Sequence, residues 1–358
     1  MSHATLCFRS QHSLPQAVAR AARRWRAPHL TGLGLLLCLF CVGCRQGTVE
    51  RRDGAGDGGK LTIAVIPKSV GGDFWETVEQ GAVEAAAEMD VDMKWEGTLT
   101  ETEIAEQNRI IENMLNLGVD GMAIAPLNAK ATWRPIESVL DAGLPVVIFD
   151  SAVQGDGFDS FVATNNLQGG VLAGQHMAEI VGTEEGKVFI LRFLQGTGST
   201  EARAEGFVQA AESAGLNIVA DTYPEDGTTA GAKKTATNYL ERYVQGDKLD
   251  LEGIFACNLV TALGMSAALD DLRKSGIEVH AKFIGFDTSP ELLKGLHNGE
   301  IDALISQDPR RMGYLAVETL VKRLRGEEVE SFIDTGVEVV TKERLENEPK
   351  IRALVGEK

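Results

Sequence analysis

Short apolar runs alternate with longer amphipathic stretches through most of the chain. The run Leu61–Ile66 has no polar alternation, which is typical of a strand buried on both faces of a parallel sheet. The chain then breaks at Gly71-Gly72, and a helical pattern follows. We expect Asp73 to be the N-cap of this helix, with Glu76 three positions later. In open α/β sheets such a junction of strand, loop and helix faces the crevice that binds ligands.

The same succession of strand, loop and helix repeats in two series. The predicted strands are 61–66, 91–95, 121–125, 145–149, 161–163, then 187–191, 217–220, 253–256, 281–285 and 301–306. The predicted helices are 73–90, 102–117, 132–142, then 166–181, 201–214, 229–244, 260–275, 290–298 and 312–325. Residues 331–358 read as partly extended and mostly polar. The alternation predicts an α/β protein with parallel sheets and right-handed crossovers, and the two series predict two similar Rossmann-like lobes.

The first 59 residues follow a different pattern. A basic segment precedes the apolar stretch Leu30–Val42, which is too short to remain in a bilayer and suits a signal peptide. Cys41-Val-Gly-Cys44 resembles the lipobox of bacterial lipoproteins, so we expect a signal peptide at 1–43 and lipidation of Cys44. An ordinary signal peptide cut nearby is the alternative. Residues 44–59 are rich in Gly and Asp and read as a flexible tether, which predicts an extracytoplasmic domain anchored to a membrane by lipid.

The composition of the chain limits the classes of partner that the protein can bind. The chain has 358 residues, enough for two lobes with a core each, and a formal net charge of −17. Such an acidic surface argues against nucleic acid and anionic membrane as partners. Four of the five Cys lie in the first 44 residues, so the body holds only Cys257 and can form neither an internal disulfide nor a thiolate metal cluster. We expect Cys257 to be a buried, inert thiol.

Hydrogen-bonding side chains follow the apolar strands. Those that come directly after strands are Lys68, Asp150, Asn258, Asp287 and Gln307, and Arg203 lies in the region after the strand that ends at Leu191. Parallel strands place their carboxyl ends at one edge, so two lobes that face each other by those edges would bring these groups into one cleft. Carboxylates accept, Arg and Lys donate, and amides do both, which suits a neutral polyol. Phe74 and Trp75 could cover the C–H face of a sugar ring.

Each candidate also has a structural interpretation. The alternatives are a solvated loop position for Lys68, a cap or turn for Asp150, a pair with Glu201 or Glu205 for Arg203, the cap of the next helix for Asn258, a turn into Pro290 for Asp287, and bonding of hinge backbone for Gln307. Phe74 and Trp75 could be core aromatics, but adjacent helix positions cannot face the same way, so we expect at least one in the cleft.

The sequence lacks the groups that hydrolysis needs. We find no G-x-S-x-G elbow, no H-E-x-x-H and no Cys paired with a His. His176, His280 and His297 are scattered, and we expect them to be solvated or capping. The sequence therefore predicts a binding protein without a cofactor or metal, not an enzyme.

At this point the chain resembles the type I periplasmic sugar-binding proteins, the family of the ribose-binding protein. The resemblance covers nearly all of 60–340 and rests on the segments 147–150, 163–170, 202–207, 285–290 and 302–309. It implies two lobes, 60–164 plus 308–334 and 165–307 plus 335–358, joined by crossings near 164–165, 307–309 and 333–338. The residues at sugar-contacting positions of that family are Phe74, Trp75, Asp150, Arg203, Asn258, Asp287 and Gln307. Ile66-Pro-Lys68 and Asp150-Ser151 are similar to the branch that binds autoinducer-2 and related sugars, in which that Lys contacts the ligand.

The leading hypothesis is a monomeric, lipid-anchored receptor that captures a sugar or sugar-like polyol and delivers it to the permease of an ABC importer. A sensor whose closed form engages a membrane kinase would have the same fold and site. An intracellular transcription regulator on this core would carry a helix-turn-helix near its N-terminus, where this chain has a signal segment instead. An enzyme on this scaffold would carry a nucleophile or metal set in the cleft.

Overall fold

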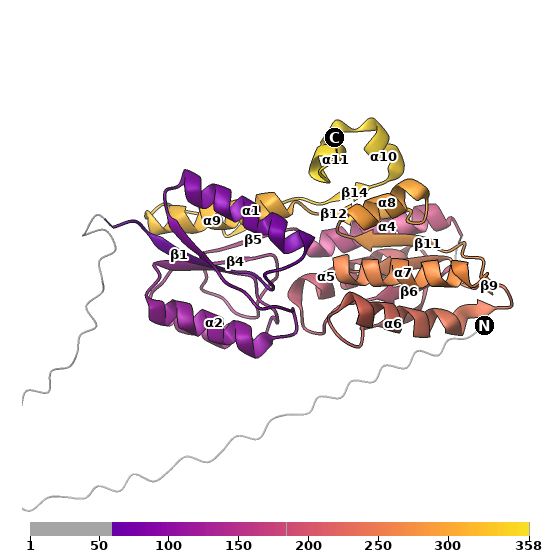
Figure 1. Cartoon of the computed structure of the whole chain (residues 1–358), viewed down its shortest axis with the longest axis horizontal. Coiled ribbons are helices and arrows are strands. Elements are labelled where there is room, and N and C mark those ends of the chain that lie inside the picture. The colour runs from indigo at the N-terminus through magenta and orange to yellow at the C-terminus, as the bar shows by residue number, and fades with distance from the viewer. Residues whose placement is uncertain (1–58, 184, 358) are drawn as a thin grey trace, which may run out of the picture. The chain divides into compact units, whose positions relative to one another are not determined.

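A computed structural model describes residues 59–183 and 185–357, which all fall in one unit of the chain. The predicted signal peptide 1–43, the lipidation site Cys44 and the tether up to residue 58 lie outside the described residues. Two six-stranded sheets dominate, in the orders β13-β5-β4-β3-β1-β2 and β14-β12-β11-β10-β6-β7 (Figure 1). All strand pairs within these two sheets are parallel except β12 with β14.

The first sheet has an apolar face on each side. Its strands are β1 (Thr62–Ile66), β2 (Asp92–Trp95), β3 (Gly121–Ile124), β4 (Val146–Phe149), β5 (Ser160–Ala163) and β13 (Phe332–Asp334). Helices α1 (Asp73–Glu88) and α9 (Pro309–Leu324) pack on Ile63 and Val65, whereas α2 (Ile104–Leu117) and α3 (Trp133–Asp141) pack on Ala64 and Ile66. Alternate residues of β1 thus enter opposite cores, which explains why the strand is apolar throughout.

The second sheet repeats this plan. Its strands are β6 (Lys187–Leu191), β7 (Asn217–Thr222), β10 (Gly253–Ala256), β11 (Lys282–Phe286), β12 (Ala303–Ser306) and β14 (Glu338–Val340). Helices α4 (Asn166–Val181) and α5 (Gly198–Ser213) cover one face, and α6 (Thr229–Leu240), α7 (Leu259–Lys274) and α8 (Pro290–Asn298) cover the other. A Cβ at Gly170 in α4 would overlap the carbonyl of Arg203 in α5, so these helices pack backbone to backbone.

The chain passes between the two sheets three times. The passages lie between β5 and α4, between β12 and α9, and between β13 and β14. The first and third passages are joined, because Thr164 and Thr335 share a hydrogen bond of 3.2 Å between their hydroxyl groups and the Asn165 amide donates to Asp334 at 3.2 Å. Two α/β halves connected in this way give the architecture expected from the repeated pattern.

Several details differ from the sequence-based predictions. The N-cap of α1 is Gly72, with φ of 90°, so Asp73 is the first helical residue and its predicted capping role is wrong. The polar end of the chain forms α10 (Lys342–Asn347) and α11 (Pro349–Leu354), whose Leu345 and Ile351 are buried against the second sheet. The predicted helix 229–244 ends at Leu240 and is followed by a 3-10 turn, η1 (Glu241–Tyr243), and a hairpin, β8 (Val244–Gln245) with β9 (Lys248–Leu249).

Candidate functional site

A cavity of about 200 Å³ lies at the carboxyl ends of the parallel strands. All eight residues predicted from the sequence line it: Lys68, Phe74, Trp75, Asp150, Arg203, Asn258, Asp287 and Gln307. Five of them lie within two residues of the ends of β1, β4, β10, β11 and β12. Phe74 and Trp75 come from the first turn of α1, and Arg203 comes from the second turn of α5. The topology brings the strand ends to facing edges, so the predicted convergence of these side chains is observed.

Lys68 and Asp150 form a buried ion pair. Lys68 Nζ lies 2.6 Å from Asp150 Oδ2, and the two side chains are only 3% and 4% exposed. Lys68 also donates to Ser199 Oγ at 3.1 Å. Asp150 takes φ of 60°, a left-handed conformation that Asp tolerates better than most residues. The alternative of a solvated loop lysine is therefore wrong.

Arg203 is fixed by groups around the cavity rather than by acids of its own helix. Its Nε donates to Asn166 Oδ1 at 2.8 Å, and its Nη1 donates to the carbonyl of Cys257 at 3.1 Å. The guanidinium carbon lies 3.8 Å from the ring centroid of Phe286, and Nη1 lies 3.8 Å from Asp287 Oδ2. The predicted alternative was a pair with Glu201 or Glu205. It is wrong for Glu201, which bonds Arg192 and Tyr223, and for Glu205, which accepts from Gln209.

The Asp287 carboxylate accepts hydrogen bonds from two donors in different parts of the chain. Its Oδ1 accepts from Gln307 Nε2 at 2.6 Å, and its Oδ2 accepts from the amide of Leu259 at the start of α7 at 2.9 Å. Burial raises the pKa of this carboxyl group, and nearby Arg203 opposes that shift. The turn into Pro290 is capped by Ser289 instead, so that alternative for Asp287 is wrong.

The two amides differ in what their structural bonds leave available. Asn258 does cap α7, as its alternative predicted, because Oδ1 accepts from the Thr261 amide at 3.0 Å. This cap uses the acceptor and leaves Nδ2 without a bond among the described residues. Gln307 bonds Asp287 rather than hinge backbone, and its Oε1 is buried without a partner in the part of the chain that the structure describes.

Both predicted aromatic residues line the cavity. Phe74 and Trp75 meet edge to face with 5.1 Å between ring centroids, and Trp75 also packs on Phe149. Trp75 is 4% exposed, and its Nε1 donates to Glu101 Oε1 at 2.9 Å. An indole edge that is hydrogen-bonded in this way has a fixed ring orientation, which suits a wall of a binding site.

Glu101 also belongs to the site, although its sequence context did not indicate this. It lies in a polar loop after β2 and lines the cavity. Burial of its carboxylate raises its pKa, the charge of Lys68 opposes this, and Asp150 and Asp287 add to it. The loop is polar and shows no apolar period that would single out Glu101. Only the position of this loop after a strand could have indicated the residue.

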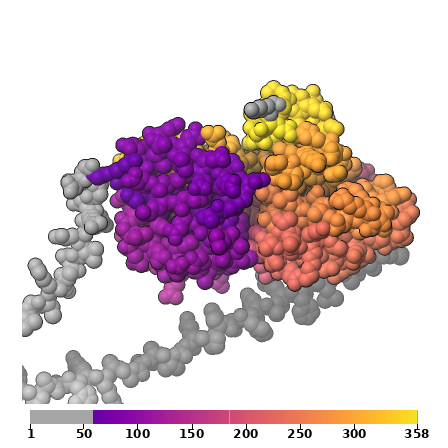
Figure 2. All heavy atoms as spheres, viewed as in Figure 1, coloured from indigo at the N-terminus to yellow at the C-terminus, as the bar shows by residue number. Residues whose placement is uncertain are grey.

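Hydrogen bonds across the cavity join the two halves. Ser199, at the start of α5, receives the bond from Lys68 and donates its amide to Ser151 Oγ at 2.8 Å. Further along the same edge, the Ala129 amide donates to the carbonyl of Gly196 at 2.9 Å. Figure 2 shows atoms of both halves in contact along a seam on this face. These bonds hold the two halves together beside the cavity.

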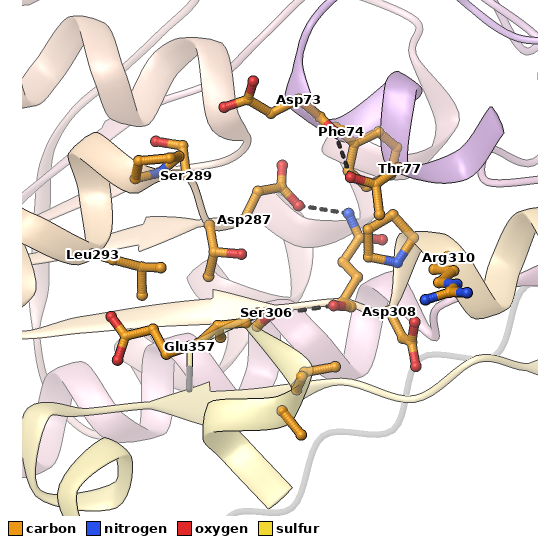
Figure 3. A pocket seen from close by; sticks show the side chains of 18 of the residues that line it. Asp73, Phe74, Thr77, Asp287, Ser289, Leu293, Ser306, Asp308, Arg310 and Glu357 are labelled. Carbon is orange, nitrogen blue, oxygen red and sulfur yellow. Dashed lines mark hydrogen bonds between the residues drawn. The ribbon is translucent and has the colours of Figure 1, made fainter. Parts of the chain in front are cut away.

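A second cavity, of about 890 Å³, adjoins the first and is lined by α1, α8, residues 306–310 and residues 353–357 (Figure 3). Phe74, Asp287 and Gln307 line both cavities. Within residues 59–183 and 185–357, no group of three His, Cys, Asp or Glu is placed to hold a metal ion. No helix in the same ranges has the length and apolar character to cross a membrane.

Residues 63–328 match the model of a family described as periplasmic binding protein domain. The ribose import binding protein of Escherichia coli K12 is 27% identical over 290 residues, which is 79% of this chain and 92% of that protein. The D-ribose/D-allose-binding protein of Pseudomonas aeruginosa is 29% identical over 296 residues, 79% of this chain and 89% of that protein.

Solved structures give a similar picture. A carbohydrate transporter solute-binding protein of Agrobacterium radiobacter, in complex with D-arabinose, has a TM-score of 0.77 at 32% identity and covers 83% of this chain and 99% of that chain. An ABC transporter solute-binding protein of Agrobacterium vitis with bound D-fucose has a TM-score of 0.75 at 35% identity, with 81% and 98% covered. The matched parts of this chain include both α/β halves.

Proposed function

Because this chain belongs to the periplasmic binding protein family, we propose that it captures a sugar or sugar-like polyol outside the cytoplasm and delivers it to an ABC importer. The observation that carries this proposal is the convergence of strand-end acids, amides and cations in one cavity with two aromatic rings. The names of the relatives, which include ribose, allose, arabinose and fucose binders, support it.

Each predicted residue has a role in this proposal. Asp150 and Asp287 accept hydrogen bonds from hydroxyl groups of the ligand, and Arg203 and Lys68 donate hydrogen bonds to them. Asn258 and Gln307 contribute the amide atoms that their own structural bonds leave unused. Phe74 and Trp75 cover the C–H face of a ring. Charge-assisted bonds of this kind are short and directional, and a micromolar Kd, about −8 kcal/mol, is the affinity we expect.

Binding closes the two lobes around the ligand. The lobes are 60–164 plus 308–334 and 165–307 plus 335–358, and they turn about the passages near 164–165, 307–309 and 333–338. Hydrogen bonds across the cavity, such as Lys68 to Ser199, support a closed form held together by the ligand and by direct contacts. The closed pair of lobes forms one composite surface for the permease.

Binding without catalysis is part of the proposal. Cys257 is the only cysteine beyond residue 44, and burial raises the pKa of its thiol to about 12, so at neutral pH it is a protonated, enclosed group. We further propose that Cys44 carries the lipid, which tethers a monomeric receptor to the membrane. A membrane kinase as the partner of the closed form is the second candidate, and co-purification of the full chain with the importer's permease or with a kinase would distinguish them.

The proposal is tested by calorimetry and thermal shift with a panel of mono- and disaccharides. We expect at least one to bind with micromolar Kd and to raise the melting temperature, and Asp287→Asn to weaken that binding at least tenfold. Asp247→Asn makes the same chemical change at an exposed position of the same half and serves as the control. If no carbohydrate binds or shifts the melting temperature of the wild-type protein, the proposed function is refuted.

A further inference from the structure

Charged side chains in the small cavity do not balance. Three carboxylates line it, from Glu101, Asp150 and Asp287, and two cations, Lys68 and Arg203. Lys68 lies 2.6 Å from Asp150, and Arg203 lies 3.8 Å from Asp287, so each cation is assigned to one carboxylate. Glu101 is left over, and the cavity carries one more acid than base.

Glu101 has no cationic partner within the described residues. Its one hydrogen bond there is the 2.9 Å bond from Trp75 Nε1 to Oε1, which leaves Oε2 as an acceptor. Lys68 is the cation that favours its ionised form, but that ammonium already contacts Asp150, while the charges of Asp150 and Asp287 disfavour it. Glu101 is partly buried, and a carboxylate without a cation is unfavourable there, so a ligand cation beside it would offset that cost.

Other unused groups in the cavity include the donor Asn258 Nδ2, but two further acceptors are buried. Gln307 Oε1 is buried without a partner in the described part of the chain, and Asp150 Oδ2 has only the Lys68 ammonium. A neutral hydroxyl both donates and accepts, whereas an ammonium group has three donors and no acceptor. These buried acceptors, together with Glu101 Oε2, match an ammonium better than one more hydroxyl.

We propose that the ligand of this cavity carries a protonated amine, as an amino sugar or amino polyol does, and that Glu101 pairs with that amine. The inference rests on the proposed sugar-binding function and narrows its ligand class. Lys68 and Arg203 stay with their own carboxylates, and the hydroxyl groups of the ligand use the strand-end residues. Glu101 is the residue that separates amino sugars from their neutral counterparts.

The test compares matched ligands that differ only at nitrogen. Calorimetry slightly below neutral pH measures D-glucosamine against D-glucose and N-acetyl-D-glucosamine, and the corresponding galactose series, so that the ring is constant and only the charge changes. We expect the amine of at least one series to bind ten times more tightly than both neutral forms, which is about 1.4 kcal/mol. Glu101→Gln, in which the amide oxygen can still accept from Trp75, should reduce this ratio to about one.

Glu76→Gln is the matched control, because Glu76 is an exposed carboxylate on α1, next to Trp75 in sequence, and does not line the cavity. It should keep the preference for the amine. The proposal is overturned if the neutral sugars bind the wild-type protein as tightly as the amines do, or if Glu101→Gln keeps the full preference. If Glu101→Gln does not fold, the comparison of ligands on the wild-type protein is sufficient to decide. Binding of neutral sugars alone overturns this inference and leaves the proposed function standing, whereas the absence of any carbohydrate binding refutes both.

Discussion

Removing the ammonium group of Lys68 tests whether the core of the site is a buried ion pair. Lys68→Met keeps most of the apolar stem but leaves Asp150 without its cation. The pair is only 3% and 4% exposed and its atoms are 2.6 Å apart, so water is a poor substitute for the lost partner. Removal of one partner from such a pair costs about 3–5 kcal/mol, a large share of the total of about 5–15 kcal/mol for a folded domain.

The double variant Lys68→Met/Asp150→Asn separates the ion pair from the packing. Asn accepts the left-handed conformation that position 150 requires, with φ of 60°, and carries no charge. We expect the double variant to recover most of the lost free energy of unfolding, because replacing a whole buried pair by neutral groups is close to neutral.

The assay is urea denaturation of the ligand-free protein, followed by far-ultraviolet circular dichroism, with the midpoint and slope both fitted. Lys234→Met is the control, since Lys234 lies at the same 2.6 Å from Glu225 but both side chains are mostly exposed, and no resolvable change is expected there. The reasoning is refuted if Lys68→Met is as stable as Lys234→Met, or if the double variant is no more stable than Lys68→Met alone.

Three further predictions concern the pH dependence, the contacts across the cavity and the helix packing. Burial raises the pKa of Asp287, so in this pH range the folded protein holds a proton that the unfolded chain releases. The free energy of unfolding therefore rises as pH falls from the raised pKa toward the ordinary 3.8. Asp287→Asn should remove that part of the pH dependence in urea titrations. Ser199→Ala removes the bond from Lys68 and should weaken sugar binding about fivefold in calorimetry, from a loss of about 1 kcal/mol. Gly170→Ala should lower the free energy of unfolding by about 1–3 kcal/mol in urea, because its Cβ would overlap the carbonyl of Arg203.

Each of these has a control at a site without the relevant contact. For the pH dependence, Asp247→Asn should leave the slope of the free energy of unfolding unchanged. For sugar binding, Ser213→Ala is an exposed change in the same helix as Ser199. For helix packing, Gly71→Ala adds a Cβ with no atom within 4 Å, and only its stability is compared. An unchanged pH slope in Asp287→Asn would contradict the burial argument. Equal sugar affinities of the two serine variants, or equal stabilities of the two glycine variants, would contradict the other two.

Most of the fold could be predicted from the sequence because its signals are local. Apolar runs such as Leu61–Ile66 gave the parallel strands, and the helical periods between them gave the crossovers. The C-terminal helices were missed, since six-residue helices such as α10 and α11 are not stable alone and form because Leu345 and Ile351 pack against the second sheet. The antiparallel pairing of β14 is likewise a long-range contact.

For the site, the sequence alone determined which side chains follow the strands. A parallel sheet then places the carboxyl ends of its strands at one edge, independently of the loop conformations. Only the tertiary structure decided how these groups pair. It joined Lys68 to Asp150, turned Arg203 away from Glu201 and used one end of Asn258 as a cap. It also brought Glu101 from an unmarked polar loop into the cavity. Strand ends are fixed by local periodicity, whereas pairing, burial and pKa depend on atoms far apart in the chain that meet only after folding.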